Sequence, residues 1–314
     1  MTVGISLSNG LESIVITDSQ STYGEYRESA SSNKLGQFKS SNYHGVIFGT
    51  GSANIHHSIT SRLNNFEGEK LDEYVQSINS YLFSQEETNS ANYLKGKERE
   101  IHRKAIIIVN DEERKNFVSQ QTLIALSDYD KLKSQNPTYF VLVAFDILSN
   151  KIRKFVIDSN MVPEQFHSHM EIGSGSDGAN FYFTTKLQGV DTSKLQPAEL
   201  TFFVCNAYCL STINTGVGGT PKIASVNKDG VHIISVGKTR ALTNLSGAYL
   251  SEFRGKRLFA QKTLEFFEEI LNTDSPNYDK ISKYIGVSKN TLISTEIPYS
   301  NWQERANSSL FKDK

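Results

Sequence analysis

Apolar and polar residues alternate at the start of the chain, in the pattern of a β-hairpin. Val3, Ile5 and Leu7 alternate with small or polar residues, the period of a strand with one buried face. Asn9-Gly10 follows, a pair typical of two-residue turns because both residues accept positive φ. A second strand is expected over residues 11–17. With Asn9 and Gly10 as the loop, Thr2 faces Thr17, and Asp18 lies beside Thr2.

Helix-like and strand-like patterns then alternate along the chain. Helices are expected over residues 55–63, 71–82, after 179 and over 198–213, and strands over 45–49, 105–109, 122–126, 139–145, 154–157, 221–226 and 231–236. Residues 84–103 are polar and charged and are expected to form a loop or insertion. This order predicts an α+β protein, a four-layer αββα sandwich of two antiparallel sheets with a helix pair on each outer face. The expected division is a domain over residues 1–240 and a helical C-terminal extension over 241–314.

Composition adds constraints on partners and location. The 314 residues carry 33 Lys and Arg against 34 Asp and Glu, a net charge of -1. This balance argues against nucleic acid and anionic membranes as partners. No apolar run is long enough to span a membrane, and the N-terminus lacks a signal-peptide pattern, so a cytoplasmic protein is expected. His56-His57 lacks acidic or cysteine partners at ligand spacing, so we expect solvated histidines, no metal and no cofactor.

Five short segments occur in a characteristic order: TVGISLSNG, ITDSQSTYG, NKL, GVIFGTGSA and GSGS. In order and spacing they resemble the proteasome-type N-terminal-nucleophile hydrolases, including proteasome β-subunits, over residues 2–240. The DSQSTYG segment is most similar to the bacterial proteasome-like peptidase that works with an ATP-driven unfoldase. The resemblance implies an N-terminal-nucleophile type of sandwich, a polypeptide substrate, assembly of copies into rings or stacked rings, and an ATP-dependent unfoldase as partner.

The resemblance implies Thr2 as the nucleophile once Met1, the one residue before it, is removed. A hydroxyl is a poor nucleophile unless a base is beside it, and an α-amine with a pKa of about 7.7–8.0 can act as that base. Lys34, if cationic, lowers the pKa of both groups. Asp18 is expected to pair with Lys34 and keep it charged.

Further positions follow from the same resemblance. Gly49 matches the oxyanion donor, with Gly51 as the alternative, and Ser174 matches the serine near the N-terminal amine. Thr22 matches a residue whose backbone pairs with substrate. Ser21 and Ser32 match positions that line the first specificity pocket.

Two positions depart from the pattern and leave alternatives open. Asn214 stands where the family has Asp, and Val217 replaces a Ser. We expect a threonine-type peptidase that forms an acyl-enzyme on Thr2. The alternatives are a transpeptidase or ligase using the same acyl-enzyme, and a non-catalytic proteasome-like scaffold subunit.

Overall fold

A computed structural model describes residues 3–19, 21–23, 26–28, 34–50, 53–64, 70–135, 138–160, 163–213, 217, 219–251 and 260–310. The first of its two main sheets is antiparallel, in the order β10-β1-β2-β11-β12. Its strands are β1 (Val3–Ser8), β2 (Glu12–Thr17), β10 (His169–Gly173), β11 (Lys222–Asn227) and β12 (Gly230–Ile233).

The register of the first hairpin differs from the predicted one. Ser8 pairs with Ser13 and Gly4 with Thr17, so the two-residue loop was wrong. The side chain of Asn9 explains the difference: its Oδ1 accepts hydrogen bonds from the backbone N–H groups of Leu11 and Glu12, at 3.0 and 2.8 Å. This local capping holds a wider turn, and it shifts the partner of each β1 residue by two positions.

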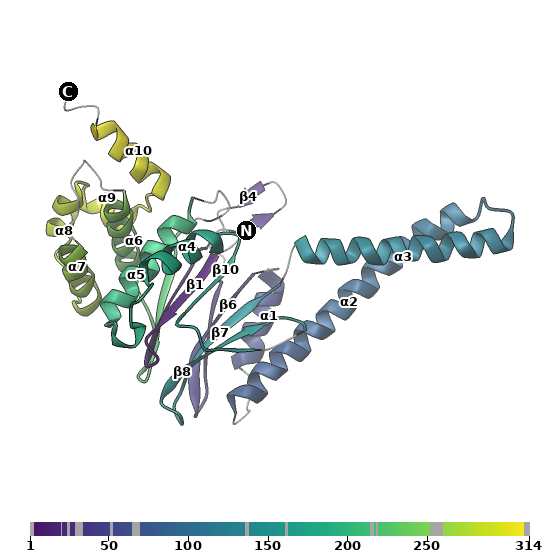
Figure 1. The fold of residues 1–314 in the computed structure, drawn as a ribbon, viewed down its shortest axis with the longest axis horizontal. Helices are drawn as coiled ribbons and strands as arrows, with labels where there is room; N and C mark the ends of the chain where they lie inside the picture. The colour runs from purple at the N-terminus through teal and green to yellow at the C-terminus, as the bar shows by residue number, and fades with distance from the viewer. Residues whose placement is uncertain are drawn as a thin grey trace.

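The second main sheet has the order β5-β6-β7-β8-β9 and is also antiparallel. Its strands are β5 (Leu35–Lys39), β6 (Tyr43–Gly49), β7 (Phe140–Asp146), β8 (Lys151–Ile157) and β9 (Glu164–Gln165). A separate two-stranded sheet joins β3 (Ser21–Tyr23) to β4 (Tyr26–Glu28). The two sheets and the surrounding helices confirm the α+β class (Figure 1).

The apolar side chains form three buried clusters. One contains residues of both sheets, among them Val15, Phe48 and Val143. The second joins β1 and β2 to α4 (Ser176–Lys186) and α5 (Pro197–Ser211). The third joins β6, β7 and β8 to α1 (Ala53–Asn64) and to the first part of α2 (Leu71–Ala105). Burial of these faces is the main term that stabilises the arrangement.

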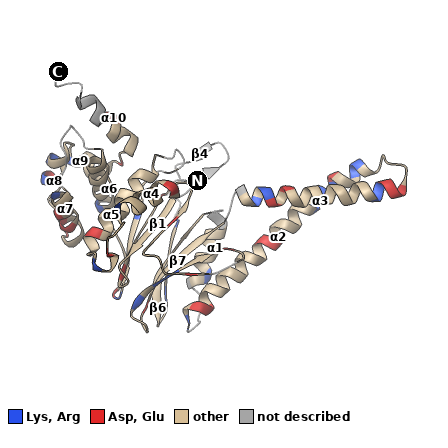
Figure 2. Cartoon of the chain, viewed as in Figure 1, with Lys and Arg blue, Asp and Glu red and all other residues tan. Residues whose placement is uncertain are grey.

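The helical hairpin of α2 and α3 (Asp111–Gln135), called the arm below, projects away from the sheets (Figure 1). Of the expected loop or insertion over residues 84–103, the loop was therefore wrong, because these residues are helical, and the predicted strands over 105–109 and 122–126 were also wrong. Both signs of charge lie along the arm (Figure 2), and pairs such as Lys104 with Glu100, at 2.8 Å, support an exposed helix without an apolar stripe.

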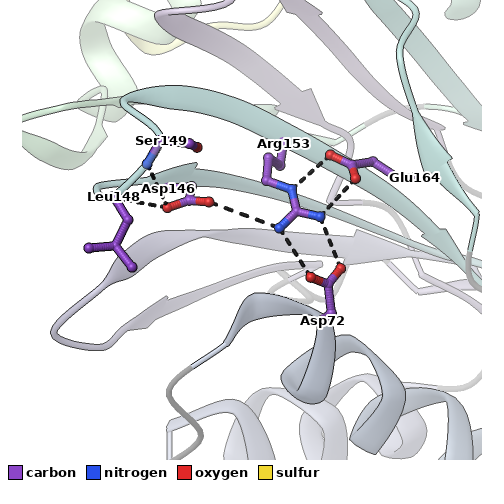
Figure 3. Close-up of polar contacts among 6 residues, drawn as sticks. All are labelled: Asp72, Asp146, Leu148, Ser149, Arg153 and Glu164. Carbon is purple, nitrogen blue, oxygen red and sulfur yellow. Dashed lines mark hydrogen bonds and ion pairs between the residues drawn. The ribbon is translucent and has the colours of Figure 1, made fainter.

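Arg153 fixes the base of the arm to the second sheet (Figure 3). Its guanidinium donates to Glu164 through Nε at 2.8 Å and Nη2 at 2.7 Å, and to Asp72 in the first turn of α2 at 2.9 Å. Asp146 lies 3.9 Å away. The hydrogen bonds with Glu164 raise the pKa of Arg153 further above its usual value. A planar guanidinium suits such multiple pairing.

The first two C-terminal helices pack on α5, and the later ones pack on these two. They are α6 (Val236–Leu250), α7 (Ala260–Asn272), α8 (Tyr278–Ile285), α9 (Lys289–Ser294) and α10 (Tyr299–Leu310), and the turn η1 (Thr192–Lys194) precedes α5. Phe267 and Trp302 are fully buried in the cluster that contains β1 and β2. The helical nature of this region agrees with its sequence pattern, whereas the division at residue 240 stays a prediction. In the part of the chain that the structure describes, no helix is both long and apolar enough to cross a membrane.

Candidate active site

A buried ion pair joins the two main sheets at one end. Asp18 directly follows β2, and Lys34 directly precedes β5. Lys34 Nζ lies 2.9 Å from Asp18 Oδ1, and the two side chains are 11% and 0% exposed. The structure thus brings together two of the predicted site residues, which are sixteen positions apart in the chain.

The same carboxylate is hydrogen-bonded to the start of β1. Asp18 Oδ1 accepts the backbone N–H of Val3 at 3.0 Å, and the N–H of Asp18 donates to the carbonyl of Val3 at 3.1 Å. Thr2 lies outside the described residues. Asp18 is therefore held by two hydrogen bonds to Val3, the residue that directly follows the predicted nucleophile Thr2.

Burial governs the electrostatics of this pair. It raises the pKa of Asp18 and lowers that of Lys34, while the attraction between the two groups opposes both shifts. Asp18 Oδ2 is also buried and accepts no hydrogen bond from the residues that are described. The charged forms therefore favour each other, because each carries a charge opposite to its partner's in a site of low polarity.

The turn after β10 lies against the start of β1. Val3 pairs with Gly173, so Ser174 directly follows the residue opposite Val3. A Cβ on Gly175 would lie 2.7 Å from Val217 and 3.1 Å from the side chain of Val3. Val217 is 6% exposed and belongs to the apolar cluster. It therefore fills space beside the turn and supplies no hydrogen-bonding side chain there, while Asn214 lies outside the described residues.

Gly49 ends β6 at the same end of the second sheet. Leu35 pairs with Phe48, so continuing the register by one step places Lys34 opposite Gly49. A Cβ on Gly49 would collide with the ring of Phe140 and would lie 2.7 Å from the carbonyl oxygen of Tyr139. A glycine is required here by close packing. The alternative oxyanion donor, Gly51, lies outside the described residues.

His56 is a neighbour of the ion pair that the sequence did not indicate. It was expected to be solvated, but it is 8% exposed, and its ring lies 5.5 Å from that of Phe140. Burial lowers its pKa, and a hydrogen bond to the backbone of Lys34 opposes that shift. His57 is exposed. The one available signal was the position of His56 beside Ile55 on the apolar side of a helix.

The predicted substrate-binding residues belong to less fully described parts of the chain. Ser21 and Thr22 lie on β3, with Thr22 opposite Arg27 of β4, and their side chains are outside the described set. Ser32 also lies outside it. Within the described residues, no group of three or more His, Cys, Asp or Glu is placed to hold a metal ion.

Comparison with known proteins gives similarity in fold alone. No protein-family model and no curated protein sequence matches the chain. Among solved structures it is similar to a Gly-1 mutant of Anbu from Hyphomicrobium sp. strain MC1, with a TM-score of 0.51 and 14% sequence identity, over 80% of this chain and 96% of that one.

This result corrects the expected membership of the proteasome-type N-terminal-nucleophile hydrolases. Without a matching family model, the resemblance consists of five short segments, and such short segments do not establish a family. The finding that replaces it is a structural likeness: the chain has a fold similar to that of Anbu.

Proposed function

We propose that the chain is a threonine-type peptide hydrolase in which Thr2, exposed by removal of Met1, is an N-terminal nucleophile. The observation that carries the proposal is the buried Asp18–Lys34 pair, hydrogen-bonded through Asp18 to the backbone N–H of Val3. The proposal treats the two sheets and their outer helices as an αββα sandwich whose nucleophile lies at the end where the sheets are joined by this pair.

The proposed reaction needs one nucleophile, one base and one oxyanion donor. The α-amine of Thr2 accepts the proton of its own hydroxyl as Oγ attacks the peptide carbonyl. The N–H of Gly49 stabilises the oxyanion, a contribution typically of about 10²–10³ in rate. The proton passes to the departing amine, and the C–N bond breaks to leave an ester on Thr2. Water then attacks this ester, which releases the acid and restores the hydroxyl.

In this proposal Lys34 and Asp18 control the protonation and the position of the nucleophile. The ammonium of Lys34 favours the deprotonated forms of the Thr2 hydroxyl and amine. Asp18 positions Lys34 and, through its hydrogen bonds with Val3, the backbone of the residue after the nucleophile. Ser174 is assigned to the side of the N-terminal amine. Ser21, Thr22 and Ser32 are assigned to substrate binding, and the substrate is a polypeptide.

Intact mass spectrometry with an epoxyketone, an inhibitor directed at N-terminal threonine, tests the proposal. The expected result is a protein without Met1 that gains the mass of one inhibitor, and a Thr2→Ala variant that gains none. Retention of Met1, or absence of the adduct in the wild type, would contradict the proposal. Products formed with a competing amine would distinguish hydrolysis from transpeptidation.

A non-catalytic scaffold is the second candidate, and the burial of Val217 favours it. An apolar side chain at this position supplies no hydroxyl of its own beside the turn that carries Ser174. If the missing hydroxyl at position 217 abolishes activity, the inhibitor adduct is absent while the protein still assembles with copies of itself or with an unfoldase. Analytical ultracentrifugation measures the assembly independently of activity.

A further inference from the structure

A pocket of about 670 Å³ lies between the base of the arm and one end of the second sheet. Its lining comes from α1, from α2, from the last turns of α3, and from the residues just before β7 and just after β8. A volume of this size lies within the range of ligand pockets, about 300–1,000 Å³. None of the predicted site residues lines it.

The pocket lies next to the strand end that carries the predicted oxyanion donor. Tyr139 lines the pocket, and its backbone is joined to Thr50, the residue after Gly49. The N–H of Thr50 donates to the carbonyl of Tyr139 at 2.8 Å, and the N–H of Tyr139 donates to Thr50 Oγ1 at 3.1 Å. A polypeptide held near Gly49 can therefore place a side chain in the pocket.

The lining is partly apolar and carries an excess of negative charge. Among the lining residues that the structure describes, the carboxylates belong to Glu86, Asp130 and Asp158, and the one ammonium belongs to Lys133, which is already paired with Glu86. Burial raises the pKa of Tyr129; the charges of Glu86 and Asp130 add to this shift, and the charge of Lys133 opposes it. The ring of Tyr129 also offers a surface on which a cation can lie.

We propose that this pocket binds a lysine or arginine side chain of the polypeptide on which the Thr2 centre acts. The aliphatic stem of such a side chain fits against Leu82 and Leu132, and its charged end fits the carboxylates of Asp130 and Asp158. The identity of the occupant as part of a substrate rests on the proposed function, whereas the preference for a cation rests on the pocket alone.

Peptide binding to the full chain carrying Thr2→Ala tests the preference without cleavage. The probes are fluorescein-labelled, alanine- and serine-based nonapeptides that differ at the central position, which is arginine, norleucine or glutamate. Fluorescence anisotropy is expected to show the arginine peptide binding about fivefold or more tightly than the norleucine peptide, and the glutamate peptide binding most weakly. No measurable binding, or equal binding of the three peptides, would overturn the proposal.

Two neutralising variants on α3 distinguish binding in the pocket from a general effect of negative charge on the protein. Asp130→Asn is expected to remove most of the preference for arginine. Asp128→Asn removes the same charge from an exposed position of α3 that does not line the pocket, and it is expected to keep the preference. An unchanged preference in Asp130→Asn and in Asp130→Lys would contradict the assignment. Failure of the epoxyketone adduct alongside a preserved arginine preference would reject the proposed function and leave the pocket assignment standing.

Discussion

Asp18 and Lys34 stabilise each other in a place where a single charge is costly. Their contact is short and nearly without solvent, and breaking such a pair by removing one partner typically costs about 3–5 kcal/mol. Replacing both partners with neutral groups of similar size costs less, because no charge is then buried. The pair therefore affects both folding and the proposed chemistry, and substitutions can separate these two roles.

We predict that Lys34→Met lowers the free energy of unfolding by about 3 kcal/mol, because it leaves the Asp18 carboxylate unpaired. The double variant Asp18→Asn, Lys34→Met is expected to recover a large part of this loss. Urea unfolding followed by circular dichroism measures both. Neither variant is expected to form the epoxyketone adduct at the wild-type rate. A double variant that is no more stable than Lys34→Met would contradict the account of the pair.

His56 provides a second prediction at the level of single residues. His56→Phe preserves a ring against Phe140 but removes the hydrogen bond to the backbone of Lys34. We expect a loss of stability of about 1–3 kcal/mol and slower adduct formation on Thr2, because the backbone that carries Lys34 is held less firmly. The matched control is His57→Phe at the exposed neighbouring position, which is expected to change neither measurement. Equal effects of the two variants would contradict a specific role for His56.

The segment between α9 and α10 places a carboxyl group inside the protein. Glu296 Oε1 accepts a hydrogen bond from the hydroxyl of Tyr208 on α5 at 3.3 Å. Burial raises the pKa of Glu296 to about 8; the hydrogen bond from Tyr208 and the charge of Arg240 oppose this, and the charge of Asp18 adds to it. Burial raises the pKa of both Tyr208 and Cys209, and the charge of Glu296 adds to both shifts. The fold therefore favours the neutral form of Glu296.

The pH dependence follows from the direction of this shift. A carboxyl group whose pKa is raised on folding stabilises the fold fully below its unfolded pKa, and for Glu296 that contribution is lost as the pH rises through its folded pKa of about 8. Glu296→Gln is expected to equal the wild type in melting temperature near pH 4.5 and to exceed it increasingly up to pH 9. The control is Glu268→Gln on the exposed side of α7, which should follow the wild type at every pH.

At the level of elements, the sequence predicted the helices and strands that bury one face, because their apolar residues recur at a regular spacing. The strands around Val143 and Val226 and the helix around Cys205 carry apolar residues at the expected period. The outer part of α2 does not, because a helix surrounded by solvent needs no apolar stripe. The predicted hairpin register was wrong for another reason. The Asn9 side chain accepts hydrogen bonds from the backbone of the turn, and the residue types alone do not show whether the turn has two residues or is wider.

The candidate site was predictable to a similar degree. Spacing and resemblance selected Asp18, Lys34 and Gly49, and the structure places these three at one end of the sheets. The contact between His56 and Lys34 joins two elements that are separate in the chain, so no local pattern could report it. The predicted family membership was wrong, because a few short matching segments carry less information than a match to a family model.

For the whole molecule, the arm is the part with the least burial. Beyond Leu82, the buried residues that the structure describes on α2 and α3 are Ile101, Ala105 and Ala125. At the outer turn, Ile106, Ile107 and Val109 are 74%, 81% and 93% exposed. The base is different, because α2 begins with a buried apolar face and is joined to Arg153 through Asp72.

Hydrogen exchange should therefore divide the arm into two parts. In the monomer, amides over residues 90–125 are expected to exchange on the order of 10³-fold faster than those of β6 and β7, because local opening there exposes little apolar surface. Amides over residues 74–82 are expected to exchange nearly as slowly as the sheets. Mass spectrometry at several protein concentrations measures both regions. Protection of the outer part that rises with concentration would show that copies of the chain cover it, whereas strong protection at every concentration would contradict the division.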